Sequence, residues 1–234
     1  MKKLARLTWQ EGMVLNQLFT DYTKVPKELR KLIKPALKKN EKLISLYLRQ
    51  SEFDVYFACS LRSKEDFEYA EEVCREIEAK IPGIQIIMPA NFAMRSNRQK
   101  GDLERLFIQK SKCILLLDSG KDTWGRDVEA AEMMILHHKP ALILVSDKSD
   151  GVYASRYRIF KEIHPKNVIG SPYRAVGMHV HKNISGLIRC LHRILKCQVE
   201  TVQKIEDGGI NHYCLSCGSL IYRSDVVWME KEKK

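Results

Sequence analysis

Residues 118–129 gather the side chains best suited to chemistry in this sequence. Acidic groups stand at Asp118, Asp122 and Glu129, and Trp124 and Gly125 lie between them. A glycine lets a ligand approach the backbone closely, and an indole offers a flat surface to a base or a nicotinamide ring. A carboxylate in this setting can stabilise or attack a sugar carbon, because positive charge develops there as the bond to a base breaks. The stretch therefore predicts a ligand site centred on Glu129.

The elements that must position these groups are predicted by an alternation of apolar and charged segments. Short apolar runs indicate strands, and charged stretches with helical periodicity follow the first three of them. Strands and helices in this order form a parallel sheet that is covered by helices. We therefore expect an α/β fold of the Rossmann-like (flavodoxin-like) class. The predicted strands are 53–59, 84–89, 113–118 and 141–145, and the predicted helices are 64–80, 101–110 and 126–138.

The ligand crevice of such a sheet lies above the carboxyl ends of the strands. Asp118 ends the third run, and a helix beginning near residue 126 places Glu129 in its first turn. The end of the first run adds the predicted substrate contacts Tyr56, Ala58, Ser60 and Arg62. A purely structural interpretation competes with this one. The helix dipole favours a glutamate in a first turn, and a tyrosine within a strand commonly belongs to the core.

Residues 53–150 resemble the nucleoside 2-deoxyribosyltransferases. The residues that carry the resemblance are, in chain order, Val55-Tyr56-Phe57-Ala58, Asp122, Gly125, Glu129 and Lys139-Pro140. The resemblance implies that Glu129 is the nucleophile that displaces the base and forms a covalent sugar intermediate. It implies further that Asp122 binds the substrate and that catalysis requires no cofactor.

The same stretch also resembles TIR domains, with residues 53–57 as the opening strand and Trp124 and Glu129 as the tryptophan–glutamate motif. That resemblance implies cleavage of NAD at its nicotinamide bond. Both families act on N-glycosidic bonds, so we expect residues 52–182 to form a domain that acts on a nucleoside, a nucleotide or NAD. The expected protein is a hydrolase or transferase, and the alternatives are a TIR-like NAD-cleaving enzyme and a non-catalytic nucleotide-sensing or adaptor protein.

Residues 1–51 form a basic arm. Before Ser51 there are twelve Lys and Arg residues against four Asp and Glu residues, so this segment supplies +8 of the net charge of +11. Helical periodicity is expected over 9–22 and 27–48, with an interruption at Pro35. Clustered cations attract nucleic acid, an anionic membrane surface or an acidic protein. The competing interpretation is an amphipathic arm whose lysines form the solvated face of a docked helix.

The chain ends with a predicted helix over 183–207 and a Cys-x-x-Cys tail over 208–234. In the tail, His212, Cys214 and Cys217 have the spacing of half a zinc site, because a closed structural site needs four ligands. Cys190, His192 or Cys197 would have to complete the site within the chain, or a second subunit would share it. We also expect a homo-oligomer. A reduced cysteine pair without metal and a thiol-exchange pair are the alternatives.

The composition predicts a cytoplasmic protein. The N-terminal residues lack the apolar stretch of a signal peptide, and no apolar run reaches the length that spans a membrane. The seven cysteines are odd in number and mostly isolated, which is atypical of a secreted disulfide framework.

Overall fold

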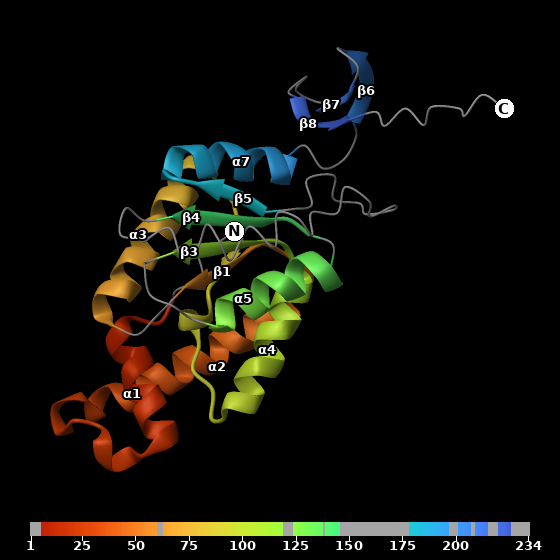
Figure 1. Ribbon diagram of the computed structural model, residues 1–234. Coiled ribbons are helices and arrows are strands. Elements are labelled where there is room, and N and C mark those ends of the chain that lie inside the picture. The colour runs from red at the N-terminus through yellow and green to blue at the C-terminus, as the bar shows by residue number, and fades with distance from the viewer. Residues whose placement is uncertain are drawn as a thin grey trace.

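The computed structural model of the protein describes residues 6–59, 63–118, 124–137, 139–145, 178–196, 201–206, 209–214 and 220–225 (Figure 1). Its main sheet has five strands in the order β2-β1-β3-β4-β5, and every pairing in it is parallel. This is the doubly wound, flavodoxin-like order that the sequence predicts. The strands are β1 (Phe53–Cys59), β2 (Ile86–Ile87), β3 (Ser111–Asp118), β4 (Ala141–Val145) and β5 (Met178–His181).

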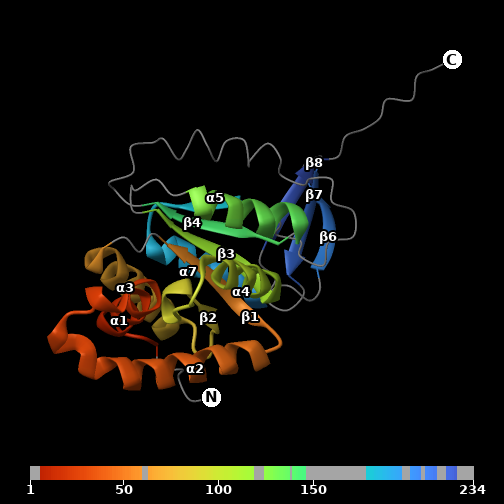
Figure 2. The ribbon, with the colours of Figure 1, turned by 90° about the horizontal axis from the view of Figure 1, so that it is seen from below.

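Helices cover both faces of this sheet (Figure 2). One face packs against α3 (Lys64–Lys80) and α7 (Ile184–Lys196), and the other packs against α4 (Asn97–Lys110) and α5 (Trp124–Ala131). A π-helical turn, η4 (Glu132–Leu136), extends α5. Alternate residues of β3 serve the two faces, since Ile114 and Leu116 join one apolar cluster and Leu115 and Leu117 join the other. Both faces of the sheet are therefore shielded from water, as is usual for a parallel sheet.

Local sequence signals set the start of α3. The hydroxyl of Ser63 accepts a hydrogen bond from the backbone N–H of Asp66, and the Asp66 carboxylate accepts one from the backbone N–H of Ser63. This capping box satisfies two of the backbone groups that a helix start leaves without partners. A turn at Gly83, where φ is +83°, separates α3 from β2.

The N-terminal arm packs onto the same core. It comprises α1 (Trp9–Thr20), η1 (Tyr22–Lys24), η2 (Lys27–Leu32) and α2 (Ile33–Arg49). The Tyr47 ring of α2 meets the rings of Phe53 and Phe107 edge-on, at centroid distances of 5.9 and 6.0 Å. The sequence predicts that the helical run breaks at Pro35, but the break lies before Ile33, where η2 ends and α2 begins. Pro35 lies in the first turn of α2, where its missing N–H removes no helical hydrogen bond.

A buried amide fastens this arm to the loop that follows β2. Asn40 is only 3% exposed, and its side-chain amide donates to the carbonyl of Ala93 at 2.8 Å. The side-chain carbonyl of Asn40 accepts from the N–H of Ala93, also at 2.8 Å. The two bonds provide partners for the backbone N–H and carbonyl of Ala93, a loop residue that belongs to no strand or helix.

The C-terminal region departs from the predicted helix over 183–207. Helix α7 ends at Lys196, and residues 201–206 form strand β6 (Thr201–Glu206). β6 pairs antiparallel with β7 (Gly209–Cys214), which pairs antiparallel with β8 (Leu220–Asp225). The β-branched residues Thr201, Val202 and Ile205 favour a strand over a further helical turn. No helix among the described residues is long and apolar enough to cross a membrane.

Replacing Asn40 with alanine should destabilise the fold. The N–H and carbonyl of Ala93, which is 3% exposed, would lose their partners, and each buried polar group without a partner costs about 1–3 kcal/mol. We expect urea unfolding to report a loss of about 2–4 kcal/mol in the free energy of unfolding. The neighbouring exposed residue provides the control variant Glu41→Ala. Equal unfolding midpoints for the two variants would show that the buried amide does not hold the arm.

Candidate functional site

The site centres on a hydrogen bond between β1 and α5. The hydroxyl of Tyr56 donates to Oε1 of Glu129 at a distance of 2.7 Å. Tyr56 is fully buried in β1, an interior strand of the sheet, whereas Glu129 is only partly buried. The order of strands reverses between β1 and β3, and the crevice at such a switch point is where doubly wound proteins bind ligands. The bond thus joins the core of the sheet to the helix that leaves its switch point.

Glu129 lies one turn deeper in its helix than the sequence predicts. α5 begins at Trp124, so Glu129 belongs to the second turn rather than the first. The stabilisation that a helix dipole gives to a carboxylate falls off within the first turn. The dipole therefore gives little reason for a glutamate at this position, and its contact with Tyr56 gives a specific one.

Electrostatics keep Tyr56 in its neutral, donating form. Burial raises the pKa of Tyr56 well above its usual value of 10, and the carboxylates of Glu129 and Glu104 raise that pKa further. The neutral phenol donates its hydrogen bond to Oε1 of Glu129 and so orients that side chain. An oriented carboxylate is the form that nucleophilic or electrostatic catalysis at a sugar carbon requires.

Glu104 is a second acidic group near Tyr56, and the sequence analysis missed it. It lies on α4, its side chain is 22% exposed, and its Oε1 lies 3.7 Å from Nζ of Lys100. Burial raises the pKa of Glu104, and Lys100 opposes that rise. The sequence signal was an ordinary i,i+4 Lys–Glu pair, which exposed helices also contain, so nothing local marked Glu104 as part of a site.

Two further predicted residues lie on the same face of the sheet as Tyr56. Ala58 is 1% exposed and belongs to the apolar cluster that contains Tyr56. Asp118 is also 1% exposed, at the carboxyl end of β3, and it follows Ile114 and Leu116 at every second position. Strand alternation therefore places Asp118 on the face that α4 and α5 cover.

Of the other predicted site residues, the structure describes some and not others. Trp124 and Gly125 form the first turn of α5, whereas Ser60, Arg62 and Asp122 lie outside the described residues. Of the predicted zinc ligands, His212 and Cys214 belong to β7, with Cys214 in register with Thr201 at the start of β6. Cys217 lies outside the described ranges. Among the residues that the structure does describe, no three His, Cys, Asp or Glu side chains gather to hold a metal ion.

Comparison with known proteins yields little. No protein-family model matches the chain, and no curated protein matches it. One similar solved structure is that of a conserved protein from Enterococcus faecalis V583. It shares 15% sequence identity and a TM-score of 0.44, over 61% of this chain and 98% of the other.

Replacing Tyr56 with phenylalanine should make the protein less sensitive to alkali. Because the pKa of Tyr56 is raised by folding, the unfolded chain releases this proton first as the pH rises through about 10. The wild type should therefore lose up to about 1.4 kcal/mol of stability per pH unit above pH 10 through this group. Urea unfolding between about pH 10 and 11.5 should show a shallower decline for Tyr56→Phe.

The control variant is Tyr22→Phe, because the Tyr22 side chain is 49% exposed. The stability of Tyr22→Phe should decline with rising pH at the same slope as that of the wild type. If Tyr56→Phe also kept the wild-type slope, the hydroxyl of Tyr56 would not be buried as described.

Proposed function

We propose that the protein cleaves the N-glycosidic bond of a nucleoside or nucleotide, as a hydrolase or a transferase, with Glu129 as the nucleophile. The observation that carries this proposal is the 2.7 Å hydrogen bond from the buried Tyr56 hydroxyl to Glu129 at the switch point of the sheet. A carboxylate fixed by a neutral donor at the mouth of a parallel sheet suits the attack on a sugar carbon. The resemblance to nucleoside 2-deoxyribosyltransferases assigns the same role to the same residue.

The proposed reaction has two displacements. A carboxylate oxygen of Glu129 bonds to the sugar carbon while the bond to the base breaks, and the base leaves with the bonding electrons and takes up a proton. An acid near the base supplies that proton, and Asp118 and Asp122 are the candidates. Water, or a second base, then displaces Glu129 from the sugar ester. Water gives the free sugar, and a second base gives a new nucleoside.

The substrate class separates the proposed activity from its nearest alternative. A TIR-like enzyme would release nicotinamide from NAD, whereas a deoxyribosyltransferase-like enzyme would release a purine or pyrimidine from a deoxynucleoside or its monophosphate. Both alternatives use Glu129, so a panel that contains both kinds of compound tests the catalytic residue and names its substrate in one experiment.

The glycosidic activity should depend on Glu129. Purified protein should release free base from at least one member of a panel of deoxynucleosides, nucleoside monophosphates and NAD, as followed by chromatography. Glu129→Gln should lower the rate by at least about a hundredfold, because an amide cannot form the sugar ester. Tyr56→Phe should retain the nucleophile Glu129 but not its orientation. Its rate of base release should therefore lie between those of the wild type and Glu129→Gln.

The matched control is Glu132→Gln, one turn further along the same helical segment. Glu132 pairs with Arg105 at 3.4 Å and with His137 at 3.5 Å, so it already has an evident structural role. It should keep wild-type rates. Absence of base release from every compound would refute the proposal, and equal rates in wild type and Glu129→Gln would refute the assignment of the nucleophile.

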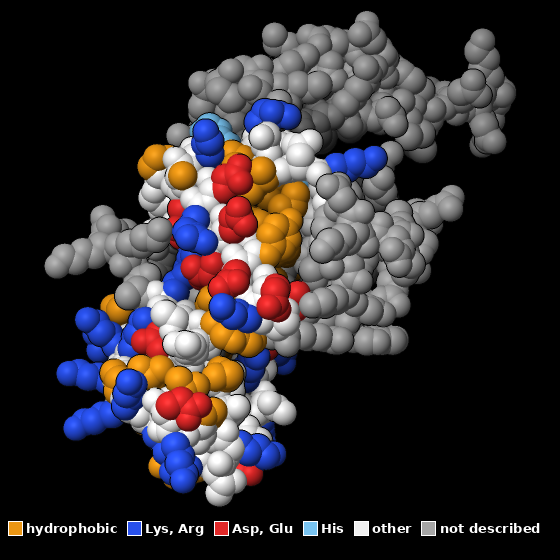
Figure 3. Space-filling view, turned by 90° about the vertical axis from the view of Figure 1, so that its left-hand side faces the viewer, with side chains coloured by type: hydrophobic (Ala, Val, Ile, Leu, Met, Phe, Trp, Pro, Cys, Tyr) orange, Lys and Arg blue, Asp and Glu red, His pale blue; other side chains and the backbone are white. Residues whose placement is uncertain are grey.

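A second function is favoured by one specific observation, a row of exposed lysines on the arm. Exposed lysines recur every three or four residues along η2 and α2, which places them on one side of the helical run. Figure 3 shows Lys and Arg side chains gathered over the part of the molecule that contains α1 and α2. The exposed lysines, called here the lysine row, are Lys27, Lys31, Lys34, Lys38 and Lys42. Among the described residues, the lysines of the arm that pair with a carboxylate are Lys24 and Lys39, which lie outside the lysine row.

We propose that the lysine row binds the phosphate backbone of a nucleic acid. The triple variant Lys31→Gln, Lys34→Gln, Lys38→Gln should reduce the slope of log affinity against log salt by about 2–3, because each lysine releases about one counterion. Fluorescence anisotropy with a labelled oligonucleotide measures that slope. A variant with the same charge change elsewhere, Lys64→Gln, Lys80→Gln, Lys182→Gln, serves as control. Identical slopes for the two variants would rule out the lysine row as the contact surface.

A further inference from the structure

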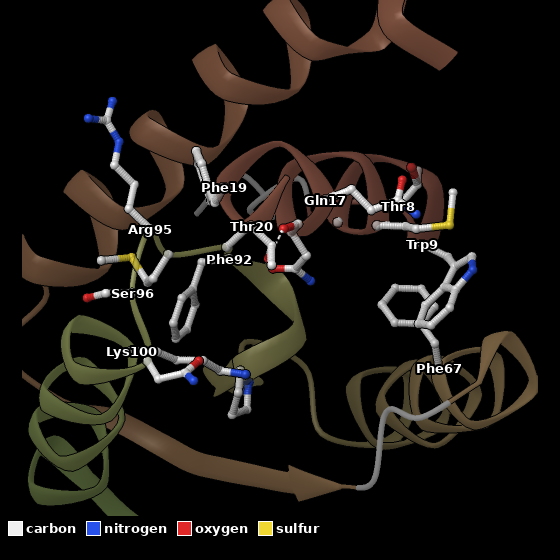
Figure 4. A pocket seen from close by; sticks show the side chains of 17 residues that line it. Thr8, Trp9, Gln17, Phe19, Thr20, Phe67, Phe92, Arg95, Ser96 and Lys100 are labelled. Atoms are coloured by element: carbon white, nitrogen blue, oxygen red, sulfur yellow. Dashed lines mark hydrogen bonds between the residues drawn. The ribbon is translucent and has the colours of Figure 1, made fainter. Parts of the chain in front are cut away.

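A groove with a volume of 630 Å³ lies between α1 and the segment that joins β2 to α4 (Figure 4). One wall is a single face of α1, since its lining residues recur at helical spacing from Thr8 to Thr20. The other wall comprises Phe67 of α3 and residues 89–100. Neither Tyr56 nor Glu129 lines the groove, so it is separate from the glycosidic site. Its volume lies within the range of small-molecule pockets, about 300–1,000 Å³.

The two ends of the groove differ in chemistry. Trp9 and Phe67 stand together at one end, with ring centroids 5.8 Å apart, and Arg95, Ser96 and Lys100 stand at the other (Figure 4). Arg95 and Lys100 are the charged residues of the lining, and no acidic side chain lines the groove within the described chain. An aromatic end and a cationic end fit a ligand that carries a flat ring and a negative group.

The start of α4 strengthens the cationic end. Ser96 is the N-cap of this 14-residue helix, and its hydroxyl accepts from the N–H of Gln99. The N–H groups of the first helical turn point out of the helix there, and the helix dipole adds partial positive charge. Lys100 also contacts Glu104 at 3.7 Å, so Arg95 and the helix start supply charge that no described acidic residue neutralises. A phosphate is the anion that such an arrangement binds best.

We propose that the groove binds a nucleotide. The base lies against the Trp9 and Phe67 end, and the phosphate lies at the Arg95 and Lys100 end. Between Trp9 and Thr20, α1 rises roughly 17 Å, which is long enough for one nucleotide laid along the helix. The proposal does not rest on glycosidic activity, because no residue of that site contributes to the groove.

Isothermal titration calorimetry with AMP, CMP, GMP and UMP tests the proposal, with the corresponding nucleosides and inorganic phosphate as separate arms. At least one monophosphate should bind more tightly than its nucleoside and than phosphate. The double variant Arg95→Gln, Lys100→Gln should weaken binding at least about tenfold, and Trp9→Ala should weaken it by about five- to a hundredfold through lost stacking.

A control variant makes the result specific. Lys80→Gln with Lys182→Gln makes the same charge change on exposed residues outside both the groove and the lysine row, and it should leave the affinity unchanged. The proposal fails if no monophosphate binds, if inorganic phosphate binds as tightly as the nucleotide, or if the groove variants bind like the control. Loss of binding in Glu129→Gln with retention in the groove variants would place the nucleotide in the glycosidic site instead.

Discussion

Burial of β1 on both faces is the constraint on which the rest of the structure depends. A strand covered on both sides leaves no water for its polar atoms, so any polar side chain on it needs a protein partner. Tyr56 is such a side chain, and Glu129 is its partner across the sheet–helix boundary. The requirement to satisfy one hydroxyl thus ties α5 to β1 and positions a carboxylate beside the sheet. The hydrogen bond that satisfies a buried group of the core is therefore also the one that sets the candidate catalytic geometry.

The basic arm is part of this core rather than an appendage to it. α2 contributes Tyr47 to the ring cluster with Phe53 and Phe107, and Asn40 satisfies both backbone groups of Ala93. The docked helix has two consequences at once. Its outer side presents the lysine row, and its contact with Ala93 fixes the loop that forms one wall of the groove beside α1.

Prediction from the sequence succeeded where the signal was local. The bounds of β4 and α3 were predicted correctly, because a short uniform apolar run marks the former and a capping box marks the start of the latter. The strand before Pro89 was predicted over 84–89, but only Ile86 and Ile87 pair with β1. Strand β6 was missed because residues 184–195 have a strong helical pattern that hides the change of period at Thr201. Glu104 and the groove depend on contacts between distant segments, which no local pattern contains.

Docking of the arm through Asn40 and Tyr47 also limits how the protein can be dissected. A fragment that began at Phe53 would expose the rings of Phe53 and Phe107 to water and strip Ala93 of its partners. Exposed apolar surface of this kind promotes self-association, so loss of a function in such a fragment would report on solubility as much as on charge. The arm behaves as an inseparable part of a folding unit, and its surface is open to study only one side chain at a time.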